Sequence, residues 1–259
     1  MKIITCMKIG FIISMYDEMD VVKKTVSVLK QNNCPIIVIQ SDPKELSKVL
    51  DQNLVDHYEK LPDLAGSKEE YLRERSNLKD ATTPVKAVTR NYCAGFLAAK
   101  KFDVDWWITI LGDIAISNLE GIEKIIQKMI QNDKSIGITR AVGQVFLDND
   151  KKPSRIQNND TTDFMPQFFI VKDDLVKQGL FSKFDITNRY TTEQCLGDEV
   201  NRFCSEKNTD FNDVVHVISD YAYPQFIEGL NYNPDKIKIP KHIDGFVNFL
   251  RRIKLKYST

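Results

Sequence analysis

The stretch TRNYCAGFLAAKKFDVDWWITILGDIAI, residues 89–116, joins a helical pattern to a strand pattern and guides the interpretation of the remaining chain. Its first half carries Ala94, Leu97 and Ala98 at spacings of three and four, which predicts a helix with a narrow apolar stripe. Gly95 has no side chain, so this helix can lie close to a sheet. We therefore expect a helix that packs on a sheet and leads into one of its strands.

The second half of the stretch predicts a buried strand at residues 106–111. Every residue of WWITIL is apolar or threonine, which is typical of a parallel strand covered on both faces. Trp106 and Trp107 are accordingly expected in the core. Asp113 follows the carboxyl end of this strand, where open α/β sheets bind their ligands. The alternative for Asp113 is an acid that ends the strand or caps the helix predicted at residues 119–130.

The composition describes a globular chain without a strong electrostatic field. Of the 259 residues, 42% are hydrophobic, and 36 lysines and arginines balance 36 aspartates and glutamates. This balance argues against nucleic acid as the partner. The five cysteines lack metal-ligand spacing, which favours reduced, buried thiols and a cytoplasmic protein. Since no domain boundary is visible, we expect a single domain over residues 1–259.

Alternating strand and helix patterns predict an α/β fold with a mostly parallel sheet. Strands are expected at residues 8–15 and 34–41 with a helix between them, and this unit implies parallel pairing. Further helices are predicted at residues 44–50, 119–130 and 191–206, and further strands at residues 55–61, 136–142, 143–147 and 164–171. Pro166 places the start of the last strand at an edge or a bend.

The helix predicted at residues 191–206 (TTEQCLGDEVNRFCSE) opens with capping-box spacing. One of its faces is apolar: Leu196, Val200 and Phe203. Glu193 shares this face at the first turn, so it is expected to point inward, whereas Asp198 lies off the stripe. Glu193 is either a functional acid or a first-turn acid that suits the helix dipole.

From about residue 235 the chain becomes basic and aromatic. Its lysines and arginines surround Phe246, Phe249 and Leu250. A solvated terminal helix explains this pattern, and peripheral contact with a membrane surface is the alternative.

A series of segments, taken in order, resembles the GT-A glycosyltransferases of the family-two kind. KIGFIISMYDEMDVVKKTVSVLKQ resembles their first strand, polar turn and helix, and IIVIQSD resembles their second strand with an acid at its tip. TRNYCAGFLAAKK is similar to their ARN-x-G helix, and WWITILGDI falls at their Asp-x-Asp strand end. FFIVKDDLVKQGLFSKF and TTEQCLGDEV are similar to their acceptor-side segment. The resemblance implies a Rossmann-type sheet flanked by helices, with a mixed, acceptor-side C-terminal part.

The resemblance also implies a divalent cation, Mn²⁺ or Mg²⁺, that stabilises a leaving diphosphate. Asp113 matches the second acid of the Asp-x-Asp motif, which is the metal ligand. Leu111 stands at the position of the first acid. This departure implies a weaker site, an acid supplied from elsewhere, or chemistry without a metal. His216 is a candidate further ligand, and a core or strand histidine is the alternative.

The donor side implied by the resemblance involves the tips of the first two strands. Ser14, Met15 and Tyr16 match the loop that lines the nucleobase, and Asp42 matches the acid that holds the base or ribose. Arg90 is a candidate for bidentate pairing with a phosphate, and a solvated arginine at a helix start is the alternative.

On the acceptor side, Glu193 matches the general base of the inverting enzymes. It would take the proton of an acceptor hydroxyl as that hydroxyl attacks the sugar, and partial burial would raise its pKa toward this task. Asp198 is the substitute if Glu193 faces elsewhere.

The leading interpretation is a cytoplasmic transferase that moves a sugar from a nucleotide sugar to a hydroxyl of a glycan or lipid-linked acceptor, as in polysaccharide biosynthesis. A nucleotidyltransferase shares the architecture, but no glycine-rich phosphate loop follows the first strand. A glycosyltransferase-like domain that has lost catalysis and serves as a binding module is the third interpretation, and Leu111 motivates it.

Overall fold

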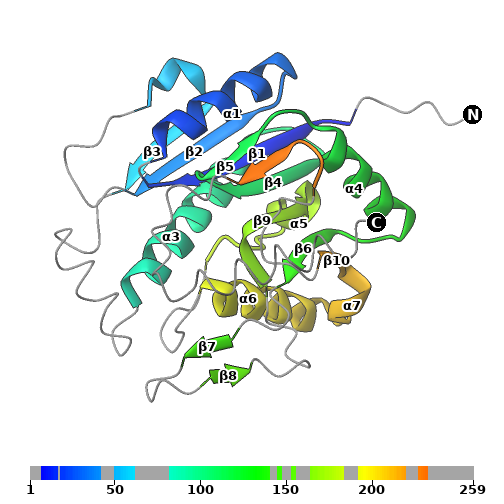
Figure 1. The fold of residues 1–259 in the computed structure, drawn as a ribbon. Helices are drawn as coiled ribbons and strands as arrows, with labels where there is room; N and C mark the ends of the chain where they lie inside the picture. Colours follow the sequence, from blue (N-terminus) through cyan, green and yellow to red (C-terminus); the bar gives the residue numbers. More distant parts are fainter. Residues whose placement is uncertain are drawn as a thin grey trace, which may run out of the picture.

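The computed structural model describes residues 7–16, 18–41, 50–61, 82–140, 145–147, 153–155, 164–183, 192–219 and 227–232. Its centre is a seven-stranded sheet in the order β10-β6-β9-β4-β1-β2-β3 (Figure 1). The strands are β1 (Ile9–Met15), β2 (Ile36–Ser41), β3 (His57–Leu61), β4 (Trp106–Leu111), β5 (Ile114–Ile116), β6 (Ile136–Arg140), β7 (Val145–Leu147), β8 (Pro153–Arg155), β9 (Phe164–Lys172), β10 (Val215–Ser219) and β11 (Leu230–Tyr232). The helices are α1 (Met19–Gln31), the 3₁₀ turn η1 (Gln52–Leu54), α3 (Thr82–Ala99), α4 (Glu120–Gln131), α5 (Asp173–Lys177), α6 (Thr192–Lys207) and α7 (Phe211–Val214).

Most neighbouring strands of this sheet run parallel. β1 pairs in parallel with β2 and β4, β2 with β3, and β6 with β10. β9 is antiparallel to both of its neighbours, β4 and β6. The order β3-β2-β1-β4 matches the first four positions of the Rossmann strand order 3-2-1-4-5-6. The predicted α/β fold with a mostly parallel sheet is therefore confirmed.

Helices cover both faces of the sheet and create two cores (Figure 1). α1 and α4 pack on the face that carries Phe11 and Ile13, whereas α3, α5 and α6 pack on the face that carries Ile12. This alternation follows from the period of two in a strand. Each fully buried side chain of this size contributes roughly 1.5–3 kcal/mol. β1 is buried along its whole length, as the continuous apolar run predicts.

α3 lies close to the sheet, but its buried stripe differs from the predicted one. A Cβ on Gly95 would come within 2.4 Å of Ile12 Cγ2, so the close approach expected there is confirmed. Leu97, expected in the stripe, is 48% exposed, and this part of the prediction is wrong. The larger side chains of Tyr92 and Phe96 determine which face of the helix is buried.

β9 lies between β4 and β6, but its pairing with β4 ends at Phe168, so Pro166 near the start of the strand lies beyond the residues paired with β4. The predicted bend has a counterpart in the pairing with β6, whose register shifts between Ile138 and Arg140. Proline lacks an N–H group and cannot complete a regular ladder at such a position.

β5 leaves the main sheet directly after the turn at Asp113. It pairs antiparallel with β11, with Ile114 opposite Tyr232 and Ile116 opposite Leu230. Thr25 of α1 holds the other side of β5: its hydroxyl donates to the Ile114 carbonyl at 3.3 Å and accepts from the Ile116 N–H at 3.1 Å. The backbone that follows Asp113 is therefore fixed by two distant parts of the chain.

Some sequence predictions fall outside the described residues. These are Asp42, residues 44–49 of a predicted helix, and the basic tail from about residue 235. Within the part of the chain that is described, no helix is long and apolar enough to cross a membrane.

Candidate functional site

The candidate site lies at the carboxyl ends of β1, β2 and β4. These strands are parallel, so their last residues meet at one edge of the sheet, with Ser14 beside Leu111 on one side and Ile39 on the other. Ligands of open α/β sheets bind at this edge. Several polar side chains are buried there: Ser14, Gln40, Ser41 and Asn91.

Asn91 of α3 connects the tips of β1 and β2. Its amide nitrogen donates to Ser14 Oγ at 3.1 Å, and its amide oxygen accepts from Ser41 Oγ at 2.6 Å. Arg90 Nη2 also reaches Ser41 Oγ, at 3.4 Å. Sequence reasoning selected Ser14 and Arg90 but missed Ser41 and Asn91. A signal was present, since Asn91 follows Arg90 in the same helical motif and Ser41 ends a buried strand.

The residues after Ser14 have different environments. Met15 is 2% exposed and belongs to the core shared with α1, so its side chain does not line the edge. Tyr16 is half-buried and its backbone is held on both sides. Its N–H donates to Glu18 Oε2 at 2.7 Å, and its carbonyl accepts from Gln40 Nε2 at 3.3 Å. Of the predicted loop, Tyr16 remains the candidate wall of a ligand site.

Asp113 lies in the turn between β4 and β5, against the tip of β1. The Gly112 N–H donates to the Ser14 carbonyl at 2.8 Å, which continues the ladder between β4 and β1. A Cβ on Gly112 would lie 2.9 Å from Met15 Cβ, so only glycine fits this approach without a shift. Asp113, half-buried, is thus placed directly beside the polar residues that follow β1.

Tyr92 shows that Asp113 and Glu193 belong to one region. Burial raises the pKa of Tyr92 well above its usual value, and the negative charges of Asp113 and Glu193 raise it further. Both carboxylates therefore lie near the same phenol, although they are far apart in the sequence. The Tyr92 hydroxyl donates to the Pro166 carbonyl of β9, and its ring packs edge-on against Phe169. Tyr92 joins α3 to the strand beside β4 and was missed by sequence reasoning.

Glu193 lies in the first turn of α6, half-buried, and the apolar face predicted for this helix is confirmed. Leu196 and Val200 are fully buried, and Phe203 is 4% exposed. Asp198 is half-buried and lies five residues after Glu193. This spacing places it about 140° around the helix from Glu193. Glu193 is thus the acid of this pair that lies near Tyr92.

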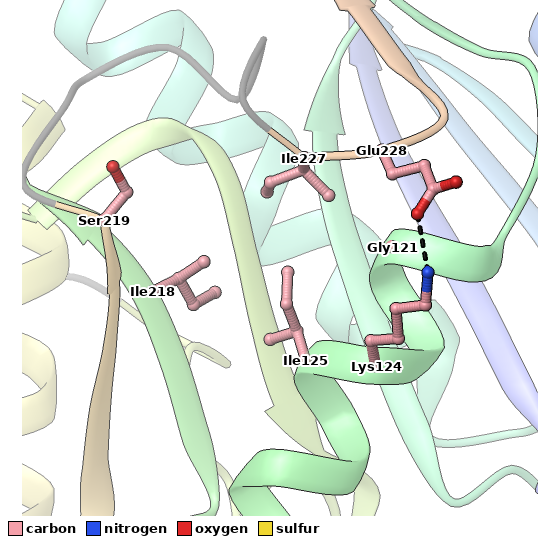
Figure 2. A pocket seen from close by; sticks show the side chains of 7 residues that line it. All are labelled: Gly121, Lys124, Ile125, Ile218, Ser219, Ile227 and Glu228. Carbon is pink, nitrogen blue, oxygen red and sulfur yellow. Dashed lines mark hydrogen bonds and ion pairs between the residues drawn. The ribbon is translucent and has the colours of Figure 1, made fainter. Parts of the chain in front are cut away.

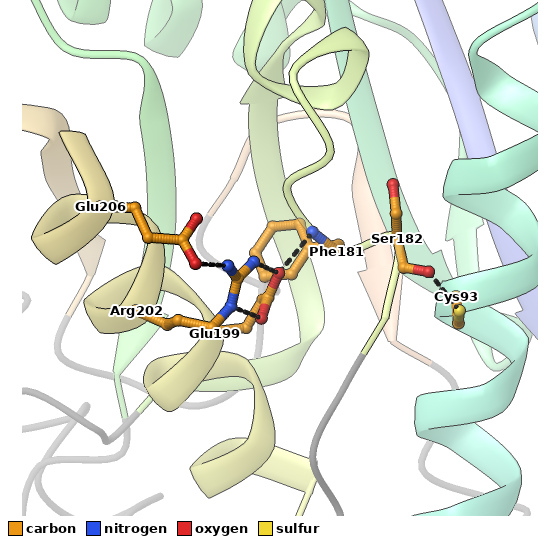
Figure 3. Close-up of polar contacts among 6 residues, drawn as sticks. All are labelled: Cys93, Phe181, Ser182, Glu199, Arg202 and Glu206. Carbon is orange, nitrogen blue, oxygen red and sulfur yellow. Dashed lines mark hydrogen bonds and ion pairs between the residues drawn. The ribbon is translucent and has the colours of Figure 1, made fainter.

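A buried ion pair fixes the middle of α6 (Figure 3). Glu199 is 5% exposed and accepts from Arg202 Nε at 2.8 Å and Arg202 Nη2 at 2.7 Å. It also accepts from the N–H of Phe181, a residue with a positive φ of 60°. The next residue, Ser182, accepts from Cys93 Sγ of α3 through its carbonyl, at 2.9 Å. This network ties α6 to α3 and so stabilises the position of Glu193.

His216 lies far from Asp113, which overturns the prediction that the two share a metal ion. His216 pairs with Gly137 of β6, which pairs with Ile170 of β9. Ile170 in turn pairs with Ile108 of β4. The intervening strands separate the two residues by about 14 Å across the sheet, and the three strand residues that follow Ile108 in β4 add about 10 Å along it. Metal ligands lie at about 2 Å from their ion.

Within the described residues, no group of three His, Cys, Asp or Glu side chains is arranged to hold a metal ion. Burial lowers the pKa of His216, and the positive charges of Lys128 and Lys134 lower it further. This environment is that of a strand histidine, which was the alternative interpretation.

A separate cavity of about 310 Å³ lies on the α4 face (Figure 2). Its wall is mainly isoleucine: Ile125, Ile218 and Ile227. Lys124 and Glu228 form an ion pair at its rim, with 2.7 Å between Nζ and Oε2. None of the predicted site residues lines this cavity.

Comparison with known proteins gives a likeness of fold. No protein-family model matches the chain, and no curated protein matches it by sequence. Among solved structures, residues 1–349 of TarS from S. aureus share 15% identity at a TM-score of 0.45, covering 84% of this chain and 59% of that fragment. This chain therefore spans less than two thirds of the TarS fragment.

Two further solved structures have a similar fold. The 4-diphosphocytidyl-2C-methyl-D-erythritol synthase from Anaerococcus prevotii shares 15% identity at a TM-score of 0.42, covering 95% of this chain and 99% of that one. Mouse xyloside xylosyltransferase 1, in its apo form, shares 11% identity at a TM-score of 0.41, covering 89% and 100%. At these identities the likeness concerns the fold alone.

Proposed function

We propose that this protein is a glycosyltransferase that uses a nucleotide sugar. The observation that carries the proposal is the network of Ser14, Asn91 and Ser41 at the tips of β1 and β2, with Asp113 in the turn beside it and Glu193 near enough to Tyr92 of α3 to raise its pKa. An acid at a strand tip could hold the cation that binds the donor diphosphate, and an acid at a helix start suits an acceptor hydroxyl. Sugar transfer requires both groups within reach of one reacting carbon.

On the donor side, Arg90 and the hydroxyl and amide groups of Ser14, Ser41 and Asn91 suit a nucleotide, which offers ribose hydroxyls and phosphate oxygens. Asp113 alone would suffice to hold Mg²⁺ or Mn²⁺ there, because such ions take most of their ligands from water and substrate phosphates. When bound, the ion would supply positive charge for the leaving diphosphate. Asp42 is the proposed ribose ligand.

On the acceptor side, Glu193 is the proposed general base. Its carboxylate would accept the proton of an acceptor hydroxyl while the new bond between that oxygen and the anomeric carbon forms. The bond between the anomeric carbon and the diphosphate oxygen breaks in the same step, and the diphosphate leaves with the electron pair. The acceptor class proposed is a glycan or a lipid-linked hydroxyl.

Isothermal titration with UDP, GDP and CMP, each with and without manganese, tests the proposal. We expect one nucleoside diphosphate to bind, with higher affinity in manganese, and Asp113→Asn to remove the manganese effect. No binding of any nucleotide would overturn the proposal. Binding that is identical in wild type and Asp113→Asn, together with no sugar transfer, would favour a binding module that has lost catalysis.

A further inference from the structure

The backbone of Tyr16 is held by side chains rather than by secondary structure. Its N–H donates to Glu18 Oε2 at 2.7 Å, and its carbonyl accepts from Gln40 Nε2 at 3.3 Å. Tyr16 follows directly after β1, where the regular ladder with β2 ends at Met15. A residue just beyond a strand normally relies on water or on a turn for these bonds. Here two side chains from different elements fix both of its polar backbone groups.

The Glu18 carboxylate serves the loop rather than the helix that follows it. Glu18 is the N-cap residue of α1, but its side chain makes no capping hydrogen bond to that helix. The residues that cap helices well have short side chains, namely Ser, Thr, Asp and Asn. The longer side chain of Glu18 turns back to the Tyr16 N–H instead.

Gln40 is oriented by a second tyrosine. Its side chain is 1% exposed, and Tyr58 Oη donates to Gln40 Oε1 at 2.6 Å. Because the amide oxygen faces Tyr58, the amide nitrogen is directed to the Tyr16 carbonyl. Tyr58 belongs to β3, the edge strand, so residues of β2 and β3 take part in holding Tyr16, which follows β1.

Gly112 brings this loop against the turn that carries Asp113. A Cβ on Gly112 would lie 2.9 Å from Glu18 Oε2 and 2.9 Å from Met15 Cβ. The glycine thus lets the Glu18 carboxylate and the β4–β5 turn share one small space. A movement of Glu18 would change its contact with Tyr16 and its contact with Gly112, the residue before Asp113.

We infer that Glu18 and Gln40 are positioning residues that hold the backbone of Tyr16 in one place beside the carboxyl ends of β1 and β2, where the proposed nucleotide would bind. This inference rests on the proposed function. Preorganised contacts raise affinity because little conformational freedom is lost on binding. The contribution of Glu18, Gln40 and Tyr58 therefore lies in donor binding, and the rate of the bound complex depends on other residues.

Three variants and a control test the inference: Glu18→Ala, Glu18→Gln, Tyr58→Phe, and Glu123→Ala, which removes an exposed first-turn acid from α4. The dissociation constant is measured by titration with the nucleotide that wild type binds. We expect about tenfold weaker binding for Glu18→Ala and about threefold for Tyr58→Phe, since each loses one hydrogen bond. Glu18→Gln keeps an oxygen acceptor and should recover most of the affinity. Glu123→Ala should match wild type.

Two further readouts separate positioning from general stability. In transfer assays the donor KM should rise with the dissociation constant, while kcat stays within about twofold. Hydrogen exchange of the Tyr16 amide should be faster in Glu18→Ala, with an unchanged melting temperature. If wild type binds nucleotide and Glu18→Ala binds it equally well, the inference is wrong and the proposed function stands. If wild type binds no nucleotide, the proposed function itself fails.

Discussion

The strands of the sheet have polar residues at both of their ends, the amino edge and the carboxyl edge, but these residues make different contacts. At the amino edge, Asp173 is 3% exposed, accepts from Trp107 Nε1 at 2.7 Å and pairs with Lys177 at 2.6 Å. At the carboxyl edge, Asn91 joins two serine hydroxyls, and Asp113 lies nearby in a turn. At the amino edge, a hydrogen-bond donor and a cation satisfy the buried carboxylate. The carboxyl edge gathers groups from several elements at the place where α/β sheets bind ligands. The difference suggests that the amino edge maintains the fold and the carboxyl edge carries the function.

Removing the proposed base should give the largest effect. Glu193→Gln should lower kcat by about 10²–10⁴-fold, the range of general-base catalysis, with little change in nucleotide affinity or melting temperature. Steady-state transfer assays and thermal unfolding measure the two quantities. Asp198→Asn is the matched comparison on the same helix. A larger loss of kcat in Asp198→Asn than in Glu193→Gln would reverse the two assignments.

Substitutions at the amino edge should lower the free energy of unfolding rather than kcat. Asp173→Ala leaves the indole N–H of Trp107 buried without its acceptor, so we expect the free energy of unfolding to fall by about 2 kcal/mol. Urea denaturation measures this change. Lys177→Ala removes a partly exposed cation and should lower the free energy of unfolding by less than Asp173→Ala does. Nucleotide affinity should be unchanged in both variants. A large loss of affinity in Asp173→Ala would contradict the division between the two edges.

Asn91→Ala tests the same division from the carboxyl edge. Ser14 and Ser41 lose their shared partner, which should cost about 1 kcal/mol of stability. Nucleotide binding should weaken by about tenfold if the network orients Ser14 and Ser41 toward the ligand. Titration and urea denaturation of one preparation give both values. Lost stability with unchanged affinity would mean that this network, like the one at Asp173, serves the fold.

The smallest effect is expected at His216. Burial and the charges of Lys128 and Lys134 keep its pKa in the folded protein below its ordinary value near 6.5. The unfolded chain therefore binds this proton first, so its contribution to stability is present above pH 6.5 and is lost as the pH falls toward the folded pKa. His216→Gln should lose slightly less stability than wild type between pH 8 and pH 5. Manganese affinity should be the same in both, and a clear loss of it would restore a metal role.

Local patterns were sufficient to predict most elements of the described fold. The uninterrupted apolar run at residues 106–111 predicted β4 with its observed bounds, and the spacing of Leu196, Val200 and Phe203 predicted the buried face of α6. The period of a helix does not reveal which of two apolar stripes is buried. For this reason Leu97 was placed inside, whereas the larger Tyr92 and Phe96 occupy the core.

The candidate site was harder to predict because it depends on contacts between distant residues. Asn91 and Ser41 are hydrogen-bonded across 50 positions, and no spacing within either segment specifies that pairing. His216 was misplaced for a related reason. Its strand is separated from β4 by β6 and β9, and strand order follows from packing between elements rather than from the pattern within one. Asp113 was selected from its place after a buried strand and Glu193 from the apolar face of its helix, and the resemblance gave them roles. That both act on the pKa of Tyr92 follows from the structure alone.

The pairing of β5 with β11 has a consequence for the order of events during synthesis. Ile116 pairs with Leu230, so the strand that follows Asp113 cannot pair until a segment 114 residues further along the chain has been synthesised. At ribosomal rates of about 5–20 residues per second, this interval lasts roughly 6–23 s. During that time β1 and β2 can already pair, while the turn at Asp113 lacks one of its supports. The carboxyl edge is therefore completed only after the last described strand has been synthesised.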